Sequence, residues 1–430
     1  MPSLQLSIGV LSLAIWLYLV FARGAFWRLR PFDDDLAQHA APNKWPSVVA
    51  IVPARNEAET IGQTLAALLQ QDYAGELSVI VVDDHSEDAT SQIAQRIAQQ
   101  KNAESRVEIH PASILPAGWT GKLWALNQGV TRAAAGAAKR ALSDELREGT
   151  ASAVPENGSK SWALAPEGRV LSGSLVDEAL PAFYWFTDAD IVHAPNTLGR
   201  LVSRAEQNKL DLASLMVLLQ AKTQPERALI PAFLFFFLKL DPPSWTANPN
   251  ARTAGAAGGC ILLRRKSLER IGGFPAIRSE VIDDCALARA VKRSGGKIWM
   301  GLTRASVSLR AYSSFSEIRD MIARTAFTQL RYSALLLAGT LAGMFFTYLA
   351  PVALLFVQNP APRILGLATW LLMSASFLPT VRFYRVSPLW APLLPLTALF
   401  YSYATWLSAV RYWLGRGGQW KGRAQAHRPM

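Results

Sequence analysis

Acidic side chains follow three apolar stretches of this 430-residue sequence. They are Glu57 after the first stretch, Asp83-Asp84 at the end of the second and Asp188-Ala-Asp190 after the third. Each stretch predicts a buried strand, and ligands of α/β proteins bind at the carboxyl ends of parallel strands. Carboxylate oxygens at that edge suit Mg²⁺ or Mn²⁺ together with phosphate oxygens. We therefore expect a divalent metal and a phosphate-bearing ligand there.

Each acidic motif also has a simpler explanation. The form Asp188-x-Asp190 occurs by chance in many surface turns. Asp83-Asp84 could belong to a solvated turn before a helix that Ser86 or Asp88 caps. A later pair, Asp283-Asp284, could be the exposed start of an amphipathic helix, where the helix dipole favours acids. Single motifs therefore decide little, and their combination has to carry the argument.

The acidic motifs need a sheet that brings strand ends together. Apolar runs predict strands and helical spacing predicts helices, in the order strand Ser47–Val52, helix Thr60–Gln71, strand Leu77–Val82, helix Ala89–Gln99 and strand Ala182–Thr187. Pro53 is expected to end the first strand. Continuous apolar strands alternating with helices indicate a mostly parallel sheet covered on both faces. The predicted fold class is α/β.

Three further segments differ from this pattern. Residues 24–46 are expected to be a linker. Residues 133–177 are rich in Ala, Gly, Ser and Glu, which predicts a flexible insertion with a helix over Ala133–Leu146. The short aromatic stretch Ala228–Leu238 suits a helix lying in a membrane interface.

Long apolar segments lie at both ends of the chain. Leu4–Ala22 has no charge before it and basic residues after it, so we expect an uncleaved anchor within residues 1–23 rather than a signal peptide. Residues 333–410 hold three further candidate spans: Leu335–Val357, Ile364–Pro379 and Pro388–Val410. Four spans would put the basic tail 411–430 outside the cell, against the positive-inside tendency. The proline-rich last segment is therefore expected to be re-entrant or interfacial.

The net charge of +12 lies largely beside these apolar segments. The basic residues concerned are Arg23, Arg28, Arg30, Arg411, Arg416, Lys421, Arg423 and Arg428. Such clusters retain cytoplasmic loops and attract anionic lipid, so a membrane partner is expected and a nucleic-acid partner is not. Cys260 and Cys285 have no metal-ligand spacing, which fits a reduced compartment.

Five motifs in a fixed order resemble those of family 2 glycosyltransferases with the GT-A fold: Pro53–Glu57, Val82–Thr90, Gly121–Gly129, Asp188–Asp190 and Asp283–Asp284. Further matches lie at Gly258–Arg265 and Ile271–Phe274, so the resemblance covers about Ser47 to Tyr332. Ile282–Ala288 and Trp420–Arg423 look most like the hopene-associated glycosyltransferases of hopanoid-making bacteria.

The resemblance implies a role for each matching residue. Nucleotide-sugar binding falls to residues from several motifs: Pro53, Arg55, Glu57, Asp83, Asp84, Lys122, Asp188, Gln329 and Arg331. Asp188 and Asp190 match the motif in which metal and diphosphate meet. Asp284, with Asp283 beside it, matches the acid that serves as general base. Lys122 or Arg331 could add positive charge at the phosphates.

Two departures from the family pattern bear on the product. His85 stands where Gly is usual, and Tyr332 stands where processive members carry Trp in a Gln-x-Arg-Trp motif. With Thr328 in place of a further Gln, polymer synthesis is disfavoured. The resemblance thus implies transfer of one sugar, with inversion, from a nucleotide-diphospho-sugar to a lipid such as a hopanoid. Polyprenyl phosphate, a carotenoid, and a catalytically silent membrane scaffold remain alternatives.

These expectations combine into one organisation. An anchor at 1–23 and a linker at 24–46 precede a GT-A domain at 47–332, which membrane or re-entrant segments follow at 333–410. The domain and the basic tail 411–430 are expected on the cytoplasmic side of the inner (plasma) membrane, with a UDP-sugar as donor.

Overall fold

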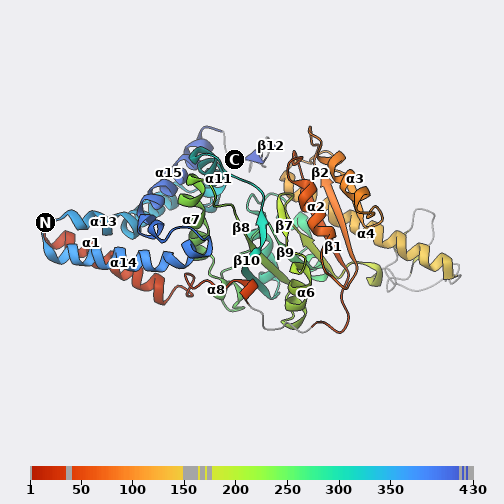
Figure 1. The fold of residues 1–430 in the computed structure, drawn as a ribbon, viewed down its shortest axis with the longest axis horizontal. Helices are drawn as coiled ribbons and strands as arrows, with labels where there is room; N and C mark the ends of the chain where they lie inside the picture. The colour runs from red at the N-terminus through yellow and green to blue at the C-terminus, as the bar shows by residue number, and fades with distance from the viewer. Residues whose placement is uncertain are drawn as a thin grey trace. The chain divides into compact units, whose positions relative to one another are not determined.

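The computed structural model describes residues 2–34, 41–148, 163–164, 170–171, 177–415, 419–420 and 423–424 (Figure 1). The chain forms two compact units. Unit 1 contains residues 1–37, 214–257 and 279–430, and unit 2 contains residues 38–213 and 258–278. The chain therefore enters unit 2 twice and returns to unit 1 each time.

The structure contains a mixed sheet of eight strands, which confirms the α/β class. Five strands of unit 2 lie in the order β3 (Val107–Pro111), β2 (Leu77–Asp83), β1 (Val48–Ala54), β6 (Phe183–Phe186) and β9 (Ile261–Arg264). The first four are parallel, and β9 is antiparallel to β6. β7 (Ile191–His193), β8 (Leu212–Leu218) and β10 (Ile298–Ser308) complete the sheet. All seven residues of β1 are buried, as a continuous apolar run requires.

Pro53 does not end the first strand, because β1 continues to Ala54. The pairing with β2 runs on through Pro53, whereas the pairing with β6 stops at Ile51. Beyond Ile51 the strand therefore has an open side, where a residue without an N–H is tolerated.

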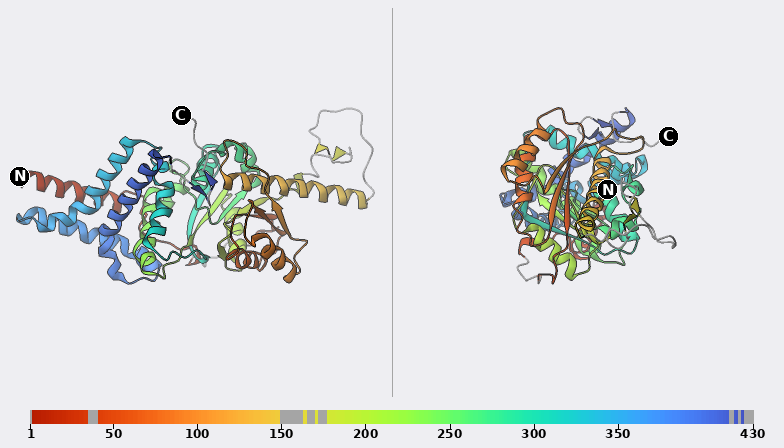
Figure 2. Two further views of the ribbon diagram at one scale, coloured as in Figure 1. Left: turned by 90° about the horizontal axis from the view of Figure 1, so that it is seen from above. Right: turned by 90° about the vertical axis from the view of Figure 1, so that its right-hand side faces the viewer.

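The helices predicted in unit 2 are confirmed within two residues as α2 (Ile61–Leu69) and α3 (Thr90–Gln100). α6 (Thr197–Gln207) and α9 (Arg265–Arg270) follow. α4 is longer than predicted and runs unbroken from Gly121 to Glu148 (Figure 2). It includes the stretch expected as a separate helix in the insertion. A Cβ on Gly129 would lie 2.5 Å from Ile51, so this glycine lets α4 approach the sheet.

The insertion predicted at 133–177 lies mostly outside the described residues. Its described parts are the end of α4 and the antiparallel pair β4 (Ala163–Leu164) and β5 (Val170–Leu171). In the tail, the structure describes only β11 (Gln419–Trp420) and β12 (Arg423–Ala424) beyond Gly415.

Unit 1 is mainly helical. Its elements are α1 (Pro2–Phe21), η1 (Phe32–Asp34), α7 (Gln224–Leu240), α8 (Pro243–Ala247), α10 (Asp283–Arg293), α11 (Phe315–Gln329), α12 (Ala334–Met344), η3 (Phe345–Leu349), α13 (Ala350–Ala353), η4 (Leu354–Phe356), α14 (Pro360–Phe383), η5 (Pro388–Leu393) and α15 (Leu394–Trp413), together with most of β8 and all of β10. Unit 2 adds the short η2 (Phe274–Ile277).

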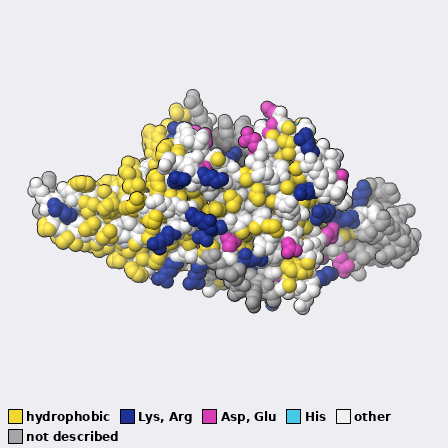
Figure 3. Space-filling model, in the orientation of Figure 1, with side chains coloured by type: hydrophobic (Ala, Val, Ile, Leu, Met, Phe, Trp, Pro, Cys, Tyr) yellow, Lys and Arg dark blue, Asp and Glu magenta, His cyan; other side chains and the backbone are white. Residues whose placement is uncertain are grey.

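Four segments of the described chain are long and apolar enough to cross a membrane: Leu4–Phe21, Ala334–Phe356, Pro360–Phe383 and Pro388–Trp413. The third is a 24-residue helix, longer than the predicted Ile364–Pro379, because its charged ends Arg363 and Arg382 remain helical. Apolar side chains gather on the surface of unit 1 that carries α1, α13 and α14 (Figure 3). Exposed examples include Leu4, Val10, Phe21, Phe356 and Ile364.

The prolines of the last segment lie at its start. Pro388 and Pro392 belong to η5, and Pro395 lies in the first turn of α15. The remaining helix is unbroken, so the segment is long enough to span a membrane. The re-entrant arrangement stays a prediction.

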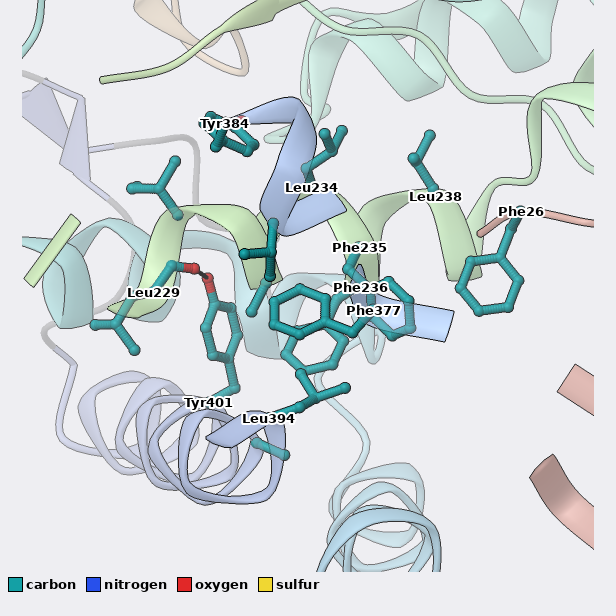
Figure 4. Packing of buried hydrophobic residues seen from close by; sticks show 14 of the residues in the cluster. Phe26, Leu229, Leu234, Phe235, Phe236, Leu238, Phe377, Tyr384, Leu394 and Tyr401 are labelled. Carbon is teal, nitrogen blue, oxygen red and sulfur yellow. Dashed lines mark hydrogen bonds between the residues drawn. The ribbon is translucent and has the colours of Figure 1, made fainter. Parts of the chain in front are cut away.

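The prediction of an interfacial helix at Ala228–Leu238 is wrong. An interfacial helix exposes an apolar face, whereas α7 buries apolar side chains on several sides (Figure 4). Phe235 packs edge-on against Phe26 and Phe377, with ring centroids 5.1 Å apart in both pairs. Tyr401 of α15 donates a hydrogen bond of 3.0 Å to the Leu229 carbonyl. α7 is therefore part of the core around which the apolar helices of unit 1 pack.

Candidate active site

The carboxyl ends of β1 and β2 are tied together by the predicted nucleotide-binding residues. Asp84 is fully buried, and its N–H donates to the Ala54 carbonyl at 2.8 Å. The Arg55 guanidinium donates to the Asp84 carbonyl at 2.5 Å and lies 3.9 Å from its carboxylate. His85 Nδ1 lies 3.3 Å from the same carboxylate. Arg55 is thus held at the strand end with its charge beside Asp84.

Two loops that follow these strands are cross-linked by polar contacts. The Asn56 N–H donates to the Ser86 hydroxyl at 3.0 Å, and the Glu57 N–H donates to the Thr90 hydroxyl at 2.8 Å. Asp88 accepts from the Ala58 N–H at 3.1 Å and from the Thr90 N–H at 3.0 Å. Asp88 therefore joins the two loops and bonds the N–H of Thr90, the first residue of α3. The N-cap position itself is Ala89, so neither Ser86 nor Asp88 is the N-cap that the simpler interpretation expects.

Asp83 and His85 shape the second of these loops. Asp83 accepts from the Ser86 N–H at 3.0 Å and from the Ser91 hydroxyl. His85 has φ +57°, in the left-handed region that favours glycine. This conformation explains why Gly is usual in the resembling family at this point. The Asp83 carboxylate is therefore engaged in holding the loop.

Asp188 and Asp190 follow β6, the strand next to β1. Lys122, in the first turn of α4, places its ammonium nitrogen 2.8 Å from Asp188 Oδ1. The Asp188 side chain is 35% exposed, so it can reach both the lysine and a ligand from solvent. The structure thus brings together Lys122 and Asp188, two residues 66 positions apart that the sequence assigns to one site.

The turn that carries the two aspartates is supported from behind by Thr64 and His193. The Thr64 hydroxyl donates to the Ala189 carbonyl at 2.9 Å, and His193 Nε2 lies 2.8 Å from the Thr187 hydroxyl. Burial lowers the pKa of His193 to about 3, so this ring is neutral at physiological pH. Thr64 is not predicted from the sequence as part of the site, because no local pattern links it to the turn. His193 lies three residues after Asp190, a spacing that a metal ligand could have, but the sequence favours a polar residue before Pro195 and leaves it outside the predicted site.

A divalent cation fits Asp188 and Asp190. Within the described parts of the chain, no three His, Cys, Asp or Glu side chains cluster into a complete cage. Mg²⁺ commonly binds through one or two carboxylates, with phosphate oxygens and water filling the other positions. Two partly exposed acidic residues separated by one alanine provide such a partial ligand set. A bound cation would share Asp188 with Lys122.

The predicted catalytic pair lies in unit 1, in the first turn of α10. Asp284 accepts from the Cys285 N–H at 2.7 Å, and Asp283 precedes it. Both aspartates are partly exposed. The Cys285 thiol contacts the Ala256 carbonyl at 3.7 Å, and burial raises the pKa of that thiol. A helix start stabilises negative charge. This position therefore suits an acid that serves as general base, and it equally suits two acids at the exposed start of an amphipathic helix.

Unit 1 also contains an acid that the sequence did not single out, Asp241 at the carboxyl end of α7. A Cβ on Gly255 would lie 2.7 Å from the Asp241 Cβ, so the glycine permits a close approach. Burial raises the pKa of Asp241 to about 6, and Arg289 and Arg23 oppose that shift. An acid at a helix carboxyl end also faces the unfavourable pole of the dipole.

Gln329 and Arg331 lie at the end of α11 and are exposed. Arg331 and Tyr332 have φ values of +52° and +58°, so the helix ends in two successive left-handed residues. The Tyr332 ring stacks on Tyr412 of α15, with centroids 4.3 Å apart, and its hydroxyl accepts from Thr328 at 3.1 Å. Tyr332 therefore takes part in packing α11 against α15.

The predicted site residues form two groups. The first occupies the adjacent ends of β2, β1 and β6 and the start of α4, all in unit 2: Pro53, Arg55, Glu57, Asp83, Asp84, Lys122, Asp188 and Asp190. The second set lies in unit 1 on two separate helices: Asp283 and Asp284 at the start of α10, and Gln329 and Arg331 at the end of α11. The first group has the charges expected at a nucleotide diphosphate, and the second has an acid suited to proton transfer.

Residues 46–328 match the family described as Glycosyltransferase like family 2. The chain belongs to this family. It is therefore a family 2 glycosyltransferase. A mannosyltransferase of Pyrobaculum calidifontis, PcManGT, solved with GDP-Man and Mn²⁺, has a TM-score of 0.50 and 17% identity to the chain, over 94% of this chain and 99% of that one. This likeness supports the GT-A fold.

Relatives named N-acetylglucosaminyltransferase include proteins from Rhizobium and Bradyrhizobium. The one from Rhizobium leguminosarum bv. viciae is 33% identical over 111 residues, which are 25% of this chain and 26% of the relative. The one from Bradyrhizobium sp. (strain ANU 289) is 42% identical over 81 residues, which are 19% and 50%. The chain therefore matches about a quarter of the length of the Rhizobium relative and half of the length of the Bradyrhizobium relative.

Proposed function

We propose that this glycosyltransferase moves one sugar from a UDP-sugar to a lipid acceptor with inversion, using Mg²⁺ or Mn²⁺ held by Asp188 and Asp190. The observation that best supports the proposed donor-binding site is the contact between the Lys122 ammonium group and the Asp188 carboxylate at 2.8 Å, at the end of β6. It joins a fixed cation to a metal-suited carboxylate at the edge of the sheet where α/β proteins bind ligands. The names of the relatives make UDP-N-acetylglucosamine the first donor to test.

In the proposed sugar transfer, each residue of the site has a defined role. Arg55 and the loop of Asp83 and Asp84 bind the nucleotide, and Lys122 stabilises negative charge on the leaving diphosphate. The cation, when bound, acts as a Lewis acid at the same phosphates. Asp284 accepts the proton of the acceptor hydroxyl as that oxygen attacks the anomeric carbon. One displacement of this kind inverts the configuration.

The lipid acceptor is supported by the four apolar segments of unit 1. A hopanoid is proposed from the resemblance at Ile282–Ala288 and Trp420–Arg423, and a polyprenyl phosphate or carotenoid is the alternative. Tyr332 supports a single transfer, because processive members carry a tryptophan at this position, whereas the Tyr332 ring stacks on Tyr412.

We place the enzyme in the inner (plasma) membrane with its catalytic domain in the cytoplasm. Support comes from Arg23, Arg28 and Arg30, which follow the first apolar helix. Single-cysteine labelling at Gly158 and Gln425, both outside the described residues, tests the orientation after Cys260 and Cys285 are replaced. An impermeant reagent should not label either position in intact cells. Labelling at Gln425 would show an outward tail and four simple spans.

The decisive test of the function uses the full chain in nanodiscs. Isothermal titration with UDP should show binding that requires Mn²⁺, and UDP-N-acetylglucosamine with an extracted lipid mixture should give a glycolipid that mass spectrometry identifies. UDP binding that ignores Mn²⁺ would remove the metal from the proposal. Binding without any transfer to hopanoids, polyprenyl phosphates or carotenoids would contradict the lipid acceptor, and no binding of UDP or GDP would favour a silent scaffold.

A further inference from the structure

The peptide between the two proposed metal ligands is anchored to a helix far away in sequence. Ala189 lies between Asp188 and Asp190, and its carbonyl accepts the 2.9 Å hydrogen bond from Thr64 of α2. Thr64 is fully buried and Ala189 is 2% exposed. Water therefore has little access to replace this bond, and its loss would leave a buried carbonyl without its partner. The bond fixes the backbone from which both aspartates project.

Thr187, the residue before Asp188, is held by a second set of hydrogen bonds. The Thr187 hydroxyl lies 3.0 Å from the Gly259 carbonyl and 2.8 Å from His193 Nε2, and all of these groups lie within unit 2. A threonine hydroxyl has one proton, so donation to Gly259 requires His193 to donate from Nε2. The ring of His193 is held by Trp185, with centroids 4.7 Å apart. Thr187 and His193 are both buried, at 1% and 2% exposure.

We propose that Thr64 and His193 are positioning residues that hold the Thr187–Asp190 turn in the geometry for divalent-cation binding. The inference rests on the proposed metal role of Asp188 and Asp190. Metal ligands must be held within about 0.5 Å of a productive arrangement, and removing the groups behind them typically lowers metal affinity about 10–100-fold. Thr64 acts on the peptide between the ligands, and His193 acts through Thr187 on the peptide before them.

The test at Thr64 compares a substitution that removes the hydroxyl with one that keeps it. Thr64→Val removes the hydroxyl and preserves the shape, whereas Thr64→Ser keeps the hydroxyl. We expect Thr64→Val to weaken Mn²⁺ binding in the presence of UDP about 10–100-fold, measured from free Mn²⁺ by electron paramagnetic resonance, and Thr64→Ser to stay within about threefold of wild type. At saturating Mn²⁺ the kcat of Thr64→Val should largely recover. Equal Mn²⁺ affinities for the two variants would overturn the inference at Thr64.

The test at His193 follows the same design. His193→Gln offers a side-chain N–H near the position of Nε2, and His193→Leu offers none. The glutamine variant should keep more of the Mn²⁺ affinity than the leucine variant. If leucine binds Mn²⁺ as well as glutamine does, His193 has no positioning role through its hydrogen bond.

Two controls separate the possible failures. Thr369→Val removes another buried hydroxyl, which donates to the Leu365 carbonyl at 2.7 Å in α14, and it should leave Mn²⁺ affinity unchanged. Asp190→Ala should abolish Mn²⁺ binding. If Asp190→Ala binds normally, the proposed metal role itself fails. If Asp190→Ala loses binding while Thr64→Val matches Thr64→Ser, only the positioning inference fails.

Discussion

The acidic residues of unit 2 and those of unit 1 are held in different ways. In unit 2, Asp83 and Asp84 lie at the end of β2 and bond to the backbone and side chains of the loops beside them. Asp188 follows β6 and pairs with Lys122. In unit 1, Asp283 and Asp284 lie in the first turn of α10 and are partly exposed. One group is fixed by strand ends, and the other by a helix start.

This difference corresponds to two chemical tasks. A diphosphate and a metal need several charges at fixed separations, which adjacent strands of one sheet supply. A base needs one acidic side chain that can reach an incoming hydroxyl, and a helix start stabilises its charge. We therefore expect substitutions in unit 2 to affect donor and metal binding. Substitutions in unit 1 should affect the transfer rate or the stability of the fold.

The largest effect is expected from Asp190→Ala in unit 2. Removal of this carboxylate leaves Asp188, already paired with Lys122, as the remaining proposed ligand. Metal-dependent binding of UDP and sugar transfer should both disappear, while the thermal unfolding temperature stays close to that of wild type. Calorimetric titration with UDP and Mn²⁺ checks the binding. Full activity at saturating Mn²⁺ would mean that Asp190 does not bind the metal.

A large effect of another kind is expected from Asp284→Asn in unit 1. Asparagine keeps the shape and can still accept from the Cys285 N–H, but it cannot take up a proton from the acceptor. The transfer rate should fall about 10²–10⁴-fold, or about 3–5 kcal/mol of transition-state stabilisation, with donor affinity little changed. Single-turnover measurements at saturating donor isolate this step.

Asp283→Asn is the matched control for Asp284. Successive residues of a helix point roughly 100° apart, so the loss at Asp283 should be much smaller. A dependence on Asp283 and not on Asp284 would shift the assignment by one residue. Similar mild losses at both positions would support the simpler explanation of a solvated helix start.

The two units also differ in how far the sequence predicts them. The apolar pattern predicts the strands β1 and β2 and the helices α2 and α3 within two residues, because apolar periodicity is a local signal. The acids at the strand ends follow directly from those strands. Thr64 could not be predicted, because its partner Ala189 lies 125 positions away and any threonine on α2 looks the same in sequence.

In unit 1 most of the errors come from tertiary packing. The aromatic stretch of α7 has the length and composition of an interfacial helix, and its burial depends on α14 and α15, which lie far along the chain. The pattern predicts the third apolar segment too short, because charged residues at helix ends resemble boundaries. Asp241 carries no motif, and its raised pKa depends on burial that only the folded chain provides.

A moderate effect is expected from Lys122→Met, which tests the charge in unit 2. Methionine preserves much of the length and removes the ammonium group beside Asp188. The KM for the UDP-sugar should rise about 10–100-fold, because hydrogen bonds to charged groups contribute roughly 1.5–3 kcal/mol. Steady-state kinetics at several Mn²⁺ concentrations measure the change, and Lys122→Arg is the control that keeps the charge. An unchanged KM would exclude Lys122 from the diphosphate site.

The smallest effect is expected from Asp241→Asn in unit 1, and it is a gain in folding stability where the other substitutions cause losses of binding or activity. The pKa of Asp241 is raised by burial from 3.8 to about 6, so folding favours its protonated form. The ionised carboxylate therefore destabilises the fold above about pH 6, and this penalty disappears below about pH 4. An asparagine side chain is neutral at every pH, so the variant should be more stable than wild type by roughly 1–3 kcal/mol at pH 7.5 and similar to it near pH 4.

Thermal unfolding in nanodiscs at several pH values measures this difference, with Asp320→Asn as the control. Burial acts to raise the pKa of Asp320, but bonds from Arg319 and Arg411 lower it overall, so its ionised form stabilises the fold. Asp320→Asn should therefore give no gain at pH 7.5. If Asp241→Asn is instead less stable than wild type at pH 7.5, the charges of Arg289 and Arg23 outweigh burial. Asp241 would then be a stabilising ion-pair partner, and the acids of unit 1 would resemble those of unit 2 in being held by fixed charges.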